Sequence, residues 1–304
     1  MGGWLSQCDY SEDRLNNFIK EDDIKKIAEM GFDHVRLPID YNILEDENAD
    51  YIERGFEHIS FAVDTAKKYG LNILLDLHRT AGYMFDAAVG ESGFFEDESL
   101  QERFYRLWIE FAKRFGGNPE HVAFELLNEV TDKEYGPIWN GIAKECIRRI
   151  REVAPDVVIL VGSYWNNSVE AVKDLDAPYD DKIVYNFHCY DPLLFTHQHA
   201  YWVDDPEIDK DRTFEECGIS EEYFEGLFAG AIKKAEENDT ILYCGEYGVI
   251  DKVDAEEALK WFKVIDAVFK KFGIAHCVWS YKEMDFGIMD AHYDGFRDEL
   301  LKYL

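Results

Sequence analysis

The sequence lacks the features that mark membrane proteins and nucleic-acid-binding proteins. It contains no apolar run of about eighteen residues, and no signal peptide begins at Met1. Basic residues are few, since 32 Lys and Arg against 63 Asp and Glu give a formal net charge of −31. That charge would repel the phosphates of nucleic acids and of anionic membranes, whereas a neutral substrate meets no such barrier. We therefore expect no nucleic-acid or membrane partner, and a protein that is either cytoplasmic or secreted with its leader removed.

Cysteine motifs and linkers are also missing. The six cysteines are widely spaced and form no CxxC pair, so neither a zinc site nor a disulfide framework is indicated. No Gly/Ser linker or short-period repeat divides the 304 residues, of which 47% are hydrophobic, enough for a large core. We expect a single domain over residues 1–304, with a small loop insertion at about 190–222, and a monomeric protein.

Short apolar runs alternate with amphipathic helices along the chain. This alternation predicts βα units and a parallel sheet. Seven strands are predicted, over residues 34–37, 72–78, 122–129, 157–162, 183–188, 240–245 and 275–281. Two α/β architectures fit: a TIM (β/α)8 barrel whose first strand is short or missing in this chain, or an open doubly wound sheet. No Gly-rich phosphate loop follows an early strand, which favours the barrel.

Polar or aromatic residues lie at or just past the end of each predicted strand. They are Arg36, His78, Asn128, Glu129, Tyr164, Trp165, His188, Tyr190, Glu246, Tyr247 and Trp279. Each alone has a structural explanation, as an ion pair, a satisfied core histidine or a packed ring. A barrel, however, gathers the carboxyl ends of its strands into one bowl. Together these residues therefore predict an active site.

Two glutamates stand out among these strand ends. Glu129 and Glu246 come without a plausible set of metal ligands and indicate paired-carboxylate chemistry, in which one carboxyl is held protonated and the other ionised. The residues alone leave open which glutamate has which role. A metal site would depend on His197 and His199, two histidines of an acidic loop, but no third ligand follows at a fixed spacing. We expect no metal and no cofactor.

Several motifs connect these residues to a known family. They are Gly2–Gln7, Gly31–Pro38, Leu75–His78, Ala123–Glu129, Val184–His188, Phe195–Gln198, Leu242–Glu246 and Val278–Lys282. In these stretches the sequence resembles glycoside hydrolase family 5, also called cellulase family A, and within it the clostridial endoglucanase C group. The resemblance implies a barrel that hydrolyses glycosides with retention, through a glycosyl-enzyme intermediate, with two carboxyl groups about 5 Å apart. It implies no metal or organic cofactor.

The resemblance also implies a role for each matching residue. Glu129 would be the general acid/base and Glu246 the nucleophile. The supporting residues would be Arg36 and Tyr190 at the nucleophile, His188 near the acid/base, His78 at the sugar hydroxyls and Asn128 at the 2-hydroxyl. Trp279 would be the stacking platform beneath the sugar ring. Further aromatic side chains suit stacking on sugars, namely Trp4, Tyr83, Phe94, Trp165 and Trp202, and His197 is expected to line the bowl.

These features predict an endo-acting β-1,4-glucanase for cellulose-type or mixed-linkage β-glucans. A β-mannanase or an exo-β-glucosidase fits the same catalytic residues, because the loops around the bowl decide between them. A silent carbohydrate-binding barrel is a further alternative, which the presence of both glutamates disfavours. The chain departs from the family pattern in two places: Met1 stands where related chains have a first strand, and only residues 201–222 stand where the endoglucanase C group inserts a subdomain.

Overall fold

The structure is a computed structural model that describes residues 1–86 and 90–304. The predicted Gly- and aromatic-rich loop after the second strand includes residues 87–89, which lie outside the described residues. The described part of the chain contains seven strands: β1 (His34–Asp40), β2 (Asn72–Arg79), β3 (Val122–Glu125), β4 (Val158–Val161), β5 (Ile183–Cys189), β6 (Leu242–Tyr247) and β7 (Ala275–Val278). They are hydrogen-bonded in the order of the sequence, β1 to β7.

Helices follow most strands, as the alternating pattern predicts. The longer ones are α2 (Glu21–Glu29), α3 (Glu53–Lys68), α4 (Glu98–Phe115), α5 (Gly136–Arg151), α8 (Glu221–Glu237) and α9 (Ala255–Phe272). The short ones are α1 (Glu12–Asn17), α6 (Tyr164–Asn167), α7 (Leu193–Thr196), α10 (Arg297–Leu300) and the 3₁₀ turns η1 (Tyr41–Ile43), η3 (Lys133–Tyr135), η4 (Val169–Asp174), η5 (Ala291–Tyr293) and η6 (Leu301–Tyr303). The predicted C-terminal helix over 296–304 is thus a short α-helix followed by a 3₁₀ turn. No helix among the described residues is long and apolar enough to cross a membrane.

The contacts divide the chain into two compact units. Unit 1 comprises Met1, Gly3–Asn167 and Asp174–Tyr185, and unit 2 comprises Gly2, Ser168–Lys173 and Asn186–Leu304. The division falls inside strand β5, between Tyr185 and Asn186. The single domain expected from the sequence stays a prediction.

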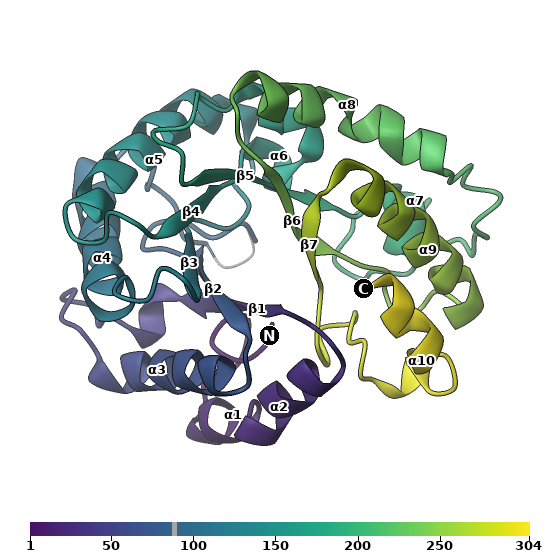
Figure 1. Ribbon diagram of the computed structural model, residues 1–304, viewed down its shortest axis with the longest axis horizontal. Coiled ribbons are helices and arrows are strands. Elements are labelled where there is room, and N and C mark those ends of the chain that lie inside the picture. The colour runs from purple at the N-terminus through teal and green to yellow at the C-terminus, as the bar shows by residue number, and fades with distance from the viewer. Residues whose placement is uncertain (87–89) are drawn as a thin grey trace. The chain divides into compact units, whose positions relative to one another are not determined.

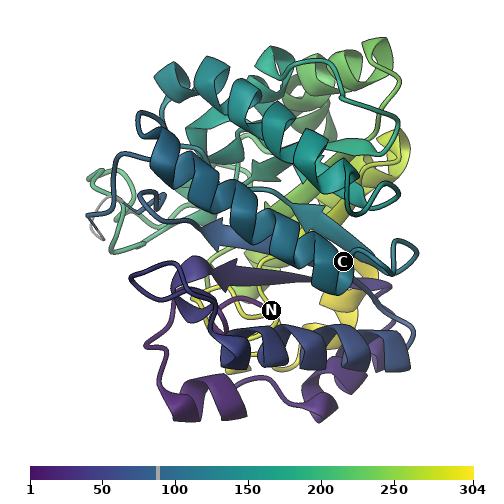
Figure 2. The same ribbon diagram turned by 90° about the vertical axis from the view of Figure 1, so that its left-hand side faces the viewer.

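In unit 1, the amphipathic helices α3, α4 and α5 lie along the outside of strands β1 to β4 (Figures 1 and 2). Asp97 caps α4 by accepting a bond from the Ser99 amide (2.8 Å). The indole of Trp108 donates to the carbonyl of Leu126 (3.0 Å), just beyond β3, and that of Trp139 donates to the carbonyl after β4 (2.8 Å). The two buried indoles thus hydrogen-bond α4 to the carboxyl end of β3 and α5 to the carboxyl end of β4, where predicted site residues lie.

The N-terminal segment forms one isolated bridge with strand β1. Leu5 pairs in parallel with Ile39, and its carbonyl accepts a bond from the Asp40 amide (2.9 Å). Strand β1 also runs three residues past its predicted end, through Pro38. Residues two apart in a strand point to the same side. The Pro38 nitrogen therefore faces the same edge of the sheet as the Asp40 amide. The described residues form a single bridge at this edge, so the N–H that proline lacks costs no bond of a continuous ladder there.

In unit 2, helices α8 and α9 accompany strands β6 and β7 (Figure 1). Ser220 and Asp254 cap the two helices, and Gly273 ends α9 in the left-handed conformation. Phe228 of α8 stacks on Phe269 of α9, with 5.8 Å between ring centroids and 4° between ring planes. This aromatic packing supports strand β6, which carries Glu246.

Candidate active site

Strand β3 ends at Glu125, four residues earlier than the sequence predicts. Beyond it, the amide of Leu126 still donates to the carbonyl of Leu160 (3.3 Å) and that of Asn128 to the carbonyl of Leu77 (3.1 Å), so the neighbouring strands hold this segment. Asn128 and Glu129 therefore remain at the carboxyl end of the strand without belonging to it. Glu129 is 8% exposed and has a φ of 40°, an uncommon conformation for a residue other than glycine.

Asn166 and Tyr83 both bind Glu129 within unit 1. The amide of Asn166 donates through Nδ2 to Oε2 of the Glu129 carboxylate (3.0 Å). The hydroxyl of Tyr83 donates to the Glu129 carbonyl (2.7 Å) and accepts a bond from the Thr131 amide (2.8 Å). Both the carboxyl group and the backbone of Glu129 are thus fixed by neighbours within unit 1.

Arg36 lies at the centre of a buried polar network in the same unit. Its Nε and Nη2 donate to the two carboxylate oxygens of Glu125 (2.6 and 2.8 Å), and Nη2 also reaches Oδ1 of Asn128 (3.0 Å) and Oδ2 of Asp76 (2.9 Å). The same Asp76 oxygen holds Nδ1 of His78 (2.7 Å). All five side chains are at most 2% exposed. Arg36, His78 and Asn128 of the predicted site are therefore brought together.

Glu125 and Asp76 are the members of this network to which the sequence analysis gave no role. A signal for them was present, because each is an acid inside an apolar strand run, and buried acids are almost always paired. Arg36 is expected from its motif to support the nucleophile, whereas the pairing with Glu125 and Asp76 becomes visible only with the strand register. Removing one partner of such a buried ion pair costs about 3–5 kcal/mol of stability.

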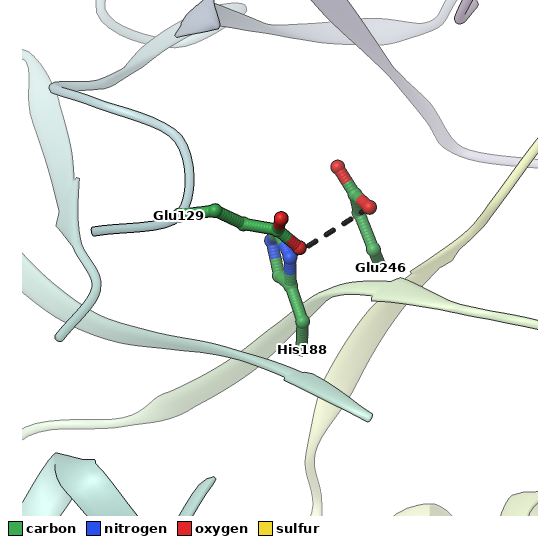
Figure 3. A group of neighbouring side chains, drawn as sticks. All are labelled: Glu129, His188 and Glu246. Carbon is green, nitrogen blue, oxygen red and sulfur yellow. Dashed lines mark ion pairs between the residues drawn. The ribbon is translucent and has the colours of Figure 1, made fainter. Parts of the chain in front are cut away.

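In unit 2, Glu246 lies near the end of β6, two residues nearer the strand centre than predicted. The Tyr190 hydroxyl donates to its Oε2 (2.9 Å), and Nδ1 of His188 lies 3.7 Å from the same oxygen (Figure 3). Glu246 and His188 are 5% and 4% exposed. Tyr190 and His188 therefore lie at the same oxygen of a buried carboxylate.

The residue before Glu246 must be small. A Cβ atom on Gly245 would lie 2.6 Å from Oδ1 of Asn186 and 3.1 Å from Nε2 of His188. Such separations are shorter than ordinary contacts, so any side chain there would displace β5 residues. Gly245 lets β5 approach β6 closely enough for His188 to reach Glu246.

A comparison with known families decides the identity of this chain. The model of the cellulase family, described as glycosyl hydrolase family 5, matches residues 5–285. The chain belongs to glycosyl hydrolase family 5.

Three relatives place the chain within family 5. Cellodextrinase A of Ruminococcus flavefaciens is 56% identical over 275 residues, which cover 90% of this chain and 82% of the relative. Endoglucanase C of Acetivibrio thermocellus is 36% identical over 331 aligned positions, covering 100% and 96% of the two chains. The structure of Thermotoga maritima Cel5A in complex with cellobiose superposes with a TM-score of 0.81 at 25% identity, over 94% of this chain and 90% of that one. With the seven parallel strands in sequence order, this likeness confirms the predicted TIM barrel class.

The two loop histidines of this family 5 chain have separate surroundings. His197 is buried, bonds the Thr196 hydroxyl (3.0 Å) and packs among the rings of Tyr190 and Trp202, and burial lowers its pKa to about 4. His199 instead bonds Asp211 (2.7 Å). Among the described residues, neither histidine belongs to a group of three possible metal ligands. This placement gives no support to the metal alternative.

The aromatic residues predicted to bind sugar differ in exposure. Trp202 is 45% exposed, and Trp279 is partly exposed beside Gly2, where a Cβ atom would lie 2.6 Å from the indole. Trp4 is 1% exposed and donates to the Leu15 carbonyl (2.8 Å), so its placement gives no support to stacking on a sugar. Tyr83 is 6% exposed, with its hydroxyl bound to backbone. Trp202 and Trp279 are thus more exposed than Trp4 and Tyr83, and Trp165 is exposed to a similar extent as Trp202, at 47%.

Proposed function

We propose that this chain is a retaining β-glucanase that cleaves β-1,4 bonds of cellulose-type and mixed-linkage β-glucans, with Glu129 as the acid/base and Glu246 as the nucleophile. The observation that carries the proposal is that each strand-end glutamate has its own donor. Asn166 bonds the carboxylate of Glu129, and Tyr190 bonds that of Glu246. In a barrel of family 5, both strand ends belong to the catalytic face.

The proposed reaction has two displacement steps. Glu246 attacks the anomeric carbon while Glu129 gives its proton to the glycosidic oxygen, so the C–O bond breaks and the leaving sugar departs as an alcohol. The covalent glycosyl-enzyme is then attacked by water, from which Glu129 removes a proton. Glu246 leaves as a carboxylate, and the anomeric configuration of the substrate is retained.

Asn128 is placed to recognise a substrate hydroxyl. Arg36 binds its Oδ1, while its Nδ2 has no hydrogen-bond partner among the residues that the structure describes. A buried donor without a partner is costly, and a sugar hydroxyl would satisfy it. This supports the expected contact of Asn128 with the 2-hydroxyl of the sugar, and the partly exposed Trp279 suits the platform beneath the ring.

The relatives support a glucan as the substrate, because the two curated ones are named cellodextrinase and endoglucanase. The 56% identity to a cellodextrinase favours a second candidate, an enzyme that acts mainly on soluble cello-oligosaccharides. Assays on barley β-glucan, carboxymethylcellulose, cellohexaose and mannan would separate these. A rapid loss of polymer viscosity indicates endo cleavage, activity on cellohexaose alone indicates the cellodextrinase, and activity on mannan alone would contradict both.

The nucleophile is tested by Glu246→Gln. We expect kcat to fall by about 10³-fold or more, because the amide cannot form the glycosyl-enzyme, while cellotetraose binding measured by calorimetry persists. Glu256→Gln, an exposed glutamate in the first turn of α9, is the control and should keep normal activity. Near-normal turnover of the Glu246→Gln protein would remove Glu246 from the proposal. NMR of the first-formed product should show the β-anomer.

A further inference from the structure

The backbone around Glu129 is held by a tyrosine from another loop. Tyr83 follows β2 in a tight turn, where its amide donates to the Thr80 carbonyl (2.9 Å) and the Thr80 amide donates back (3.2 Å). Its ring packs edge-on against Phe95, with 5.1 Å between centroids. The hydroxyl thus reaches Glu129 and Thr131 from a position that both backbone bonds and ring packing fix.

This tyrosine bridges the two sides of a strained turn. Glu129 has a left-handed φ of 40°. For a residue with a side chain this conformation costs roughly 1–3 kcal/mol, and it persists only where the surroundings enforce it. The Tyr83 hydroxyl donates to the carbonyl on one side and accepts from the Thr131 amide on the other. Burial raises the pKa of Tyr83 well above that of a free tyrosine, so the hydroxyl keeps its proton throughout the working pH range.

The same turn is held from a second side by the segment after β4. The amide of Asn166 donates to the carbonyl of Val130 (2.9 Å), and the amide of Trp165 donates to that of Thr131 (2.9 Å). With its backbone fixed in this way, Asn166 directs its side-chain amide to Oε2 of Glu129. The carboxyl group is therefore oriented through its backbone by Tyr83 and through its oxygen by Asn166.

We propose that Tyr83 and Asn166 are positioning residues that aim the Glu129 carboxyl at the glycosidic oxygen, an inference that rests on the acid/base role of Glu129 proposed above. The proton moves from the Glu129 carboxylic acid to the glycosidic oxygen as the bond to the anomeric carbon breaks. Misalignment slows this transfer, since a displacement of about 1 Å can cost on the order of 100-fold in rate. The loss is confined to leaving groups that need the proton.

The test compares two substrates with the purified protein. Phenyl β-cellobioside needs a proton on its leaving group, whereas 2,4-dinitrophenyl β-cellobioside departs without one. For Tyr83→Phe and for Asn166→Ala, we expect kcat/KM on the phenyl substrate to fall about 10-fold or more, part of the 10²–10⁴-fold typical of a general acid. On the dinitrophenyl substrate we expect a change of less than about twofold, because the proton is not needed there.

Tyr185→Phe is the matched control. Tyr185 is also a buried tyrosine of unit 1 whose hydroxyl donates to a backbone carbonyl, that of Asp176 (2.8 Å). We expect the Tyr185→Phe protein to lose a comparable amount of stability. Its kcat/KM relative to wild type should be the same on both substrates. If Tyr83→Phe and Asn166→Ala lower kcat/KM equally on the phenyl and dinitrophenyl substrates, or on neither, the proposed positioning role is contradicted. If the Tyr83→Phe protein does not fold, Tyr83 has a structural role and its positioning role is overturned. The result for Asn166→Ala then decides the positioning role of Asn166.

Glu129→Ala separates this inference from the proposed function. If Glu129 is the acid/base, the Glu129→Ala variant loses its activity on the phenyl substrate, and azide restores its turnover of the dinitrophenyl substrate. With that result, uniform effects of Tyr83→Phe and Asn166→Ala overturn only the positioning role. If Glu129→Ala itself shows no dependence on the leaving group and no azide rescue, the acid/base assignment fails, and the inference fails with it.

Discussion

At the scale of the residue, burial determines the charge of His197. Aromatic rings surround it, and with burial its pKa falls from about 6.5 to about 4. Between these two values the unfolded chain binds a proton that the folded chain does not. Stability therefore rises with pH in this window, and the contribution of His197 is lost as the pH falls from 6.5 towards 4.

His197→Asn should make the protein less sensitive to acid. We expect the wild-type free energy of unfolding to decrease by up to a few kcal/mol between pH 6.5 and pH 4.5 on account of this residue, and the variant to lose that part of the slope. Urea unfolding at pH 7, 5.5 and 4.5 measures it. Equal slopes for wild type and His197→Asn would contradict the prediction.

At the scale of the element, the sequence predicts which strands and helices exist better than where they end. All seven strands are found, yet β3 stops at Glu125 rather than Glu129, and β1 continues through Pro38. Periodicity cannot distinguish a strand from a segment held by single bonds to Leu77 and Leu160. Likewise, a proline signals a strand end unless its nitrogen faces an open edge, and edges are a property of the assembled sheet.

Residues of the candidate site could be predicted where a motif names them, but not where a contact joins elements that are far apart in the sequence. Glu129, Glu246 and Tyr190 follow from strand ends and resemblance. The bond from Asn166 to Glu129 depends on left-handed backbone angles at Trp165 and Asn166, in a four-residue helix that no sequence period marks. Its polar side chain alone is ordinary for a loop. Positioning contacts of this kind require the three-dimensional structure.

The loop after β5 should set the preferred chain length of the substrate. Trp202 is held edge-on by His197 and Tyr201, with 6.0 and 4.8 Å between ring centroids, and remains 45% exposed. We expect Trp202→Ala to lower kcat/KM on cellohexaose about 3- to 10-fold, the equivalent of one aromatic contact, with little change on cellotriose. Phe272→Ala, an exposed aromatic at the end of α9, is the control. Equal losses on both sugars would disprove an outer binding position.

At the scale of the whole molecule, charge opposes folding. The net charge of −31 arises because acids outnumber bases nearly two to one, and a net charge this far from zero destabilises the compact state through self-repulsion. We expect Tm to rise by a few degrees between 20 and 300 mM NaCl, corresponding to about 1 kcal/mol or more of screened repulsion. Thermal unfolding in NaCl and in KCl should give the same shift if screening is the cause. A fall in Tm with salt would contradict this prediction.

The left-handed backbone of Glu129 carries a consequence for the evolution of this chain. Selection for stability alone would favour glycine at position 129, because glycine adopts a φ of 40° without strain. Glu129→Gly should therefore be more stable than Glu129→Ala by about 1 kcal/mol in urea unfolding, although both lack the carboxyl group. Equal stabilities would show that the turn is relaxed. A protein that keeps the glutamate therefore has a lower free energy of unfolding than its glycine variant. A gene copy released from purifying selection is expected to drift towards a more stable, inactive barrel.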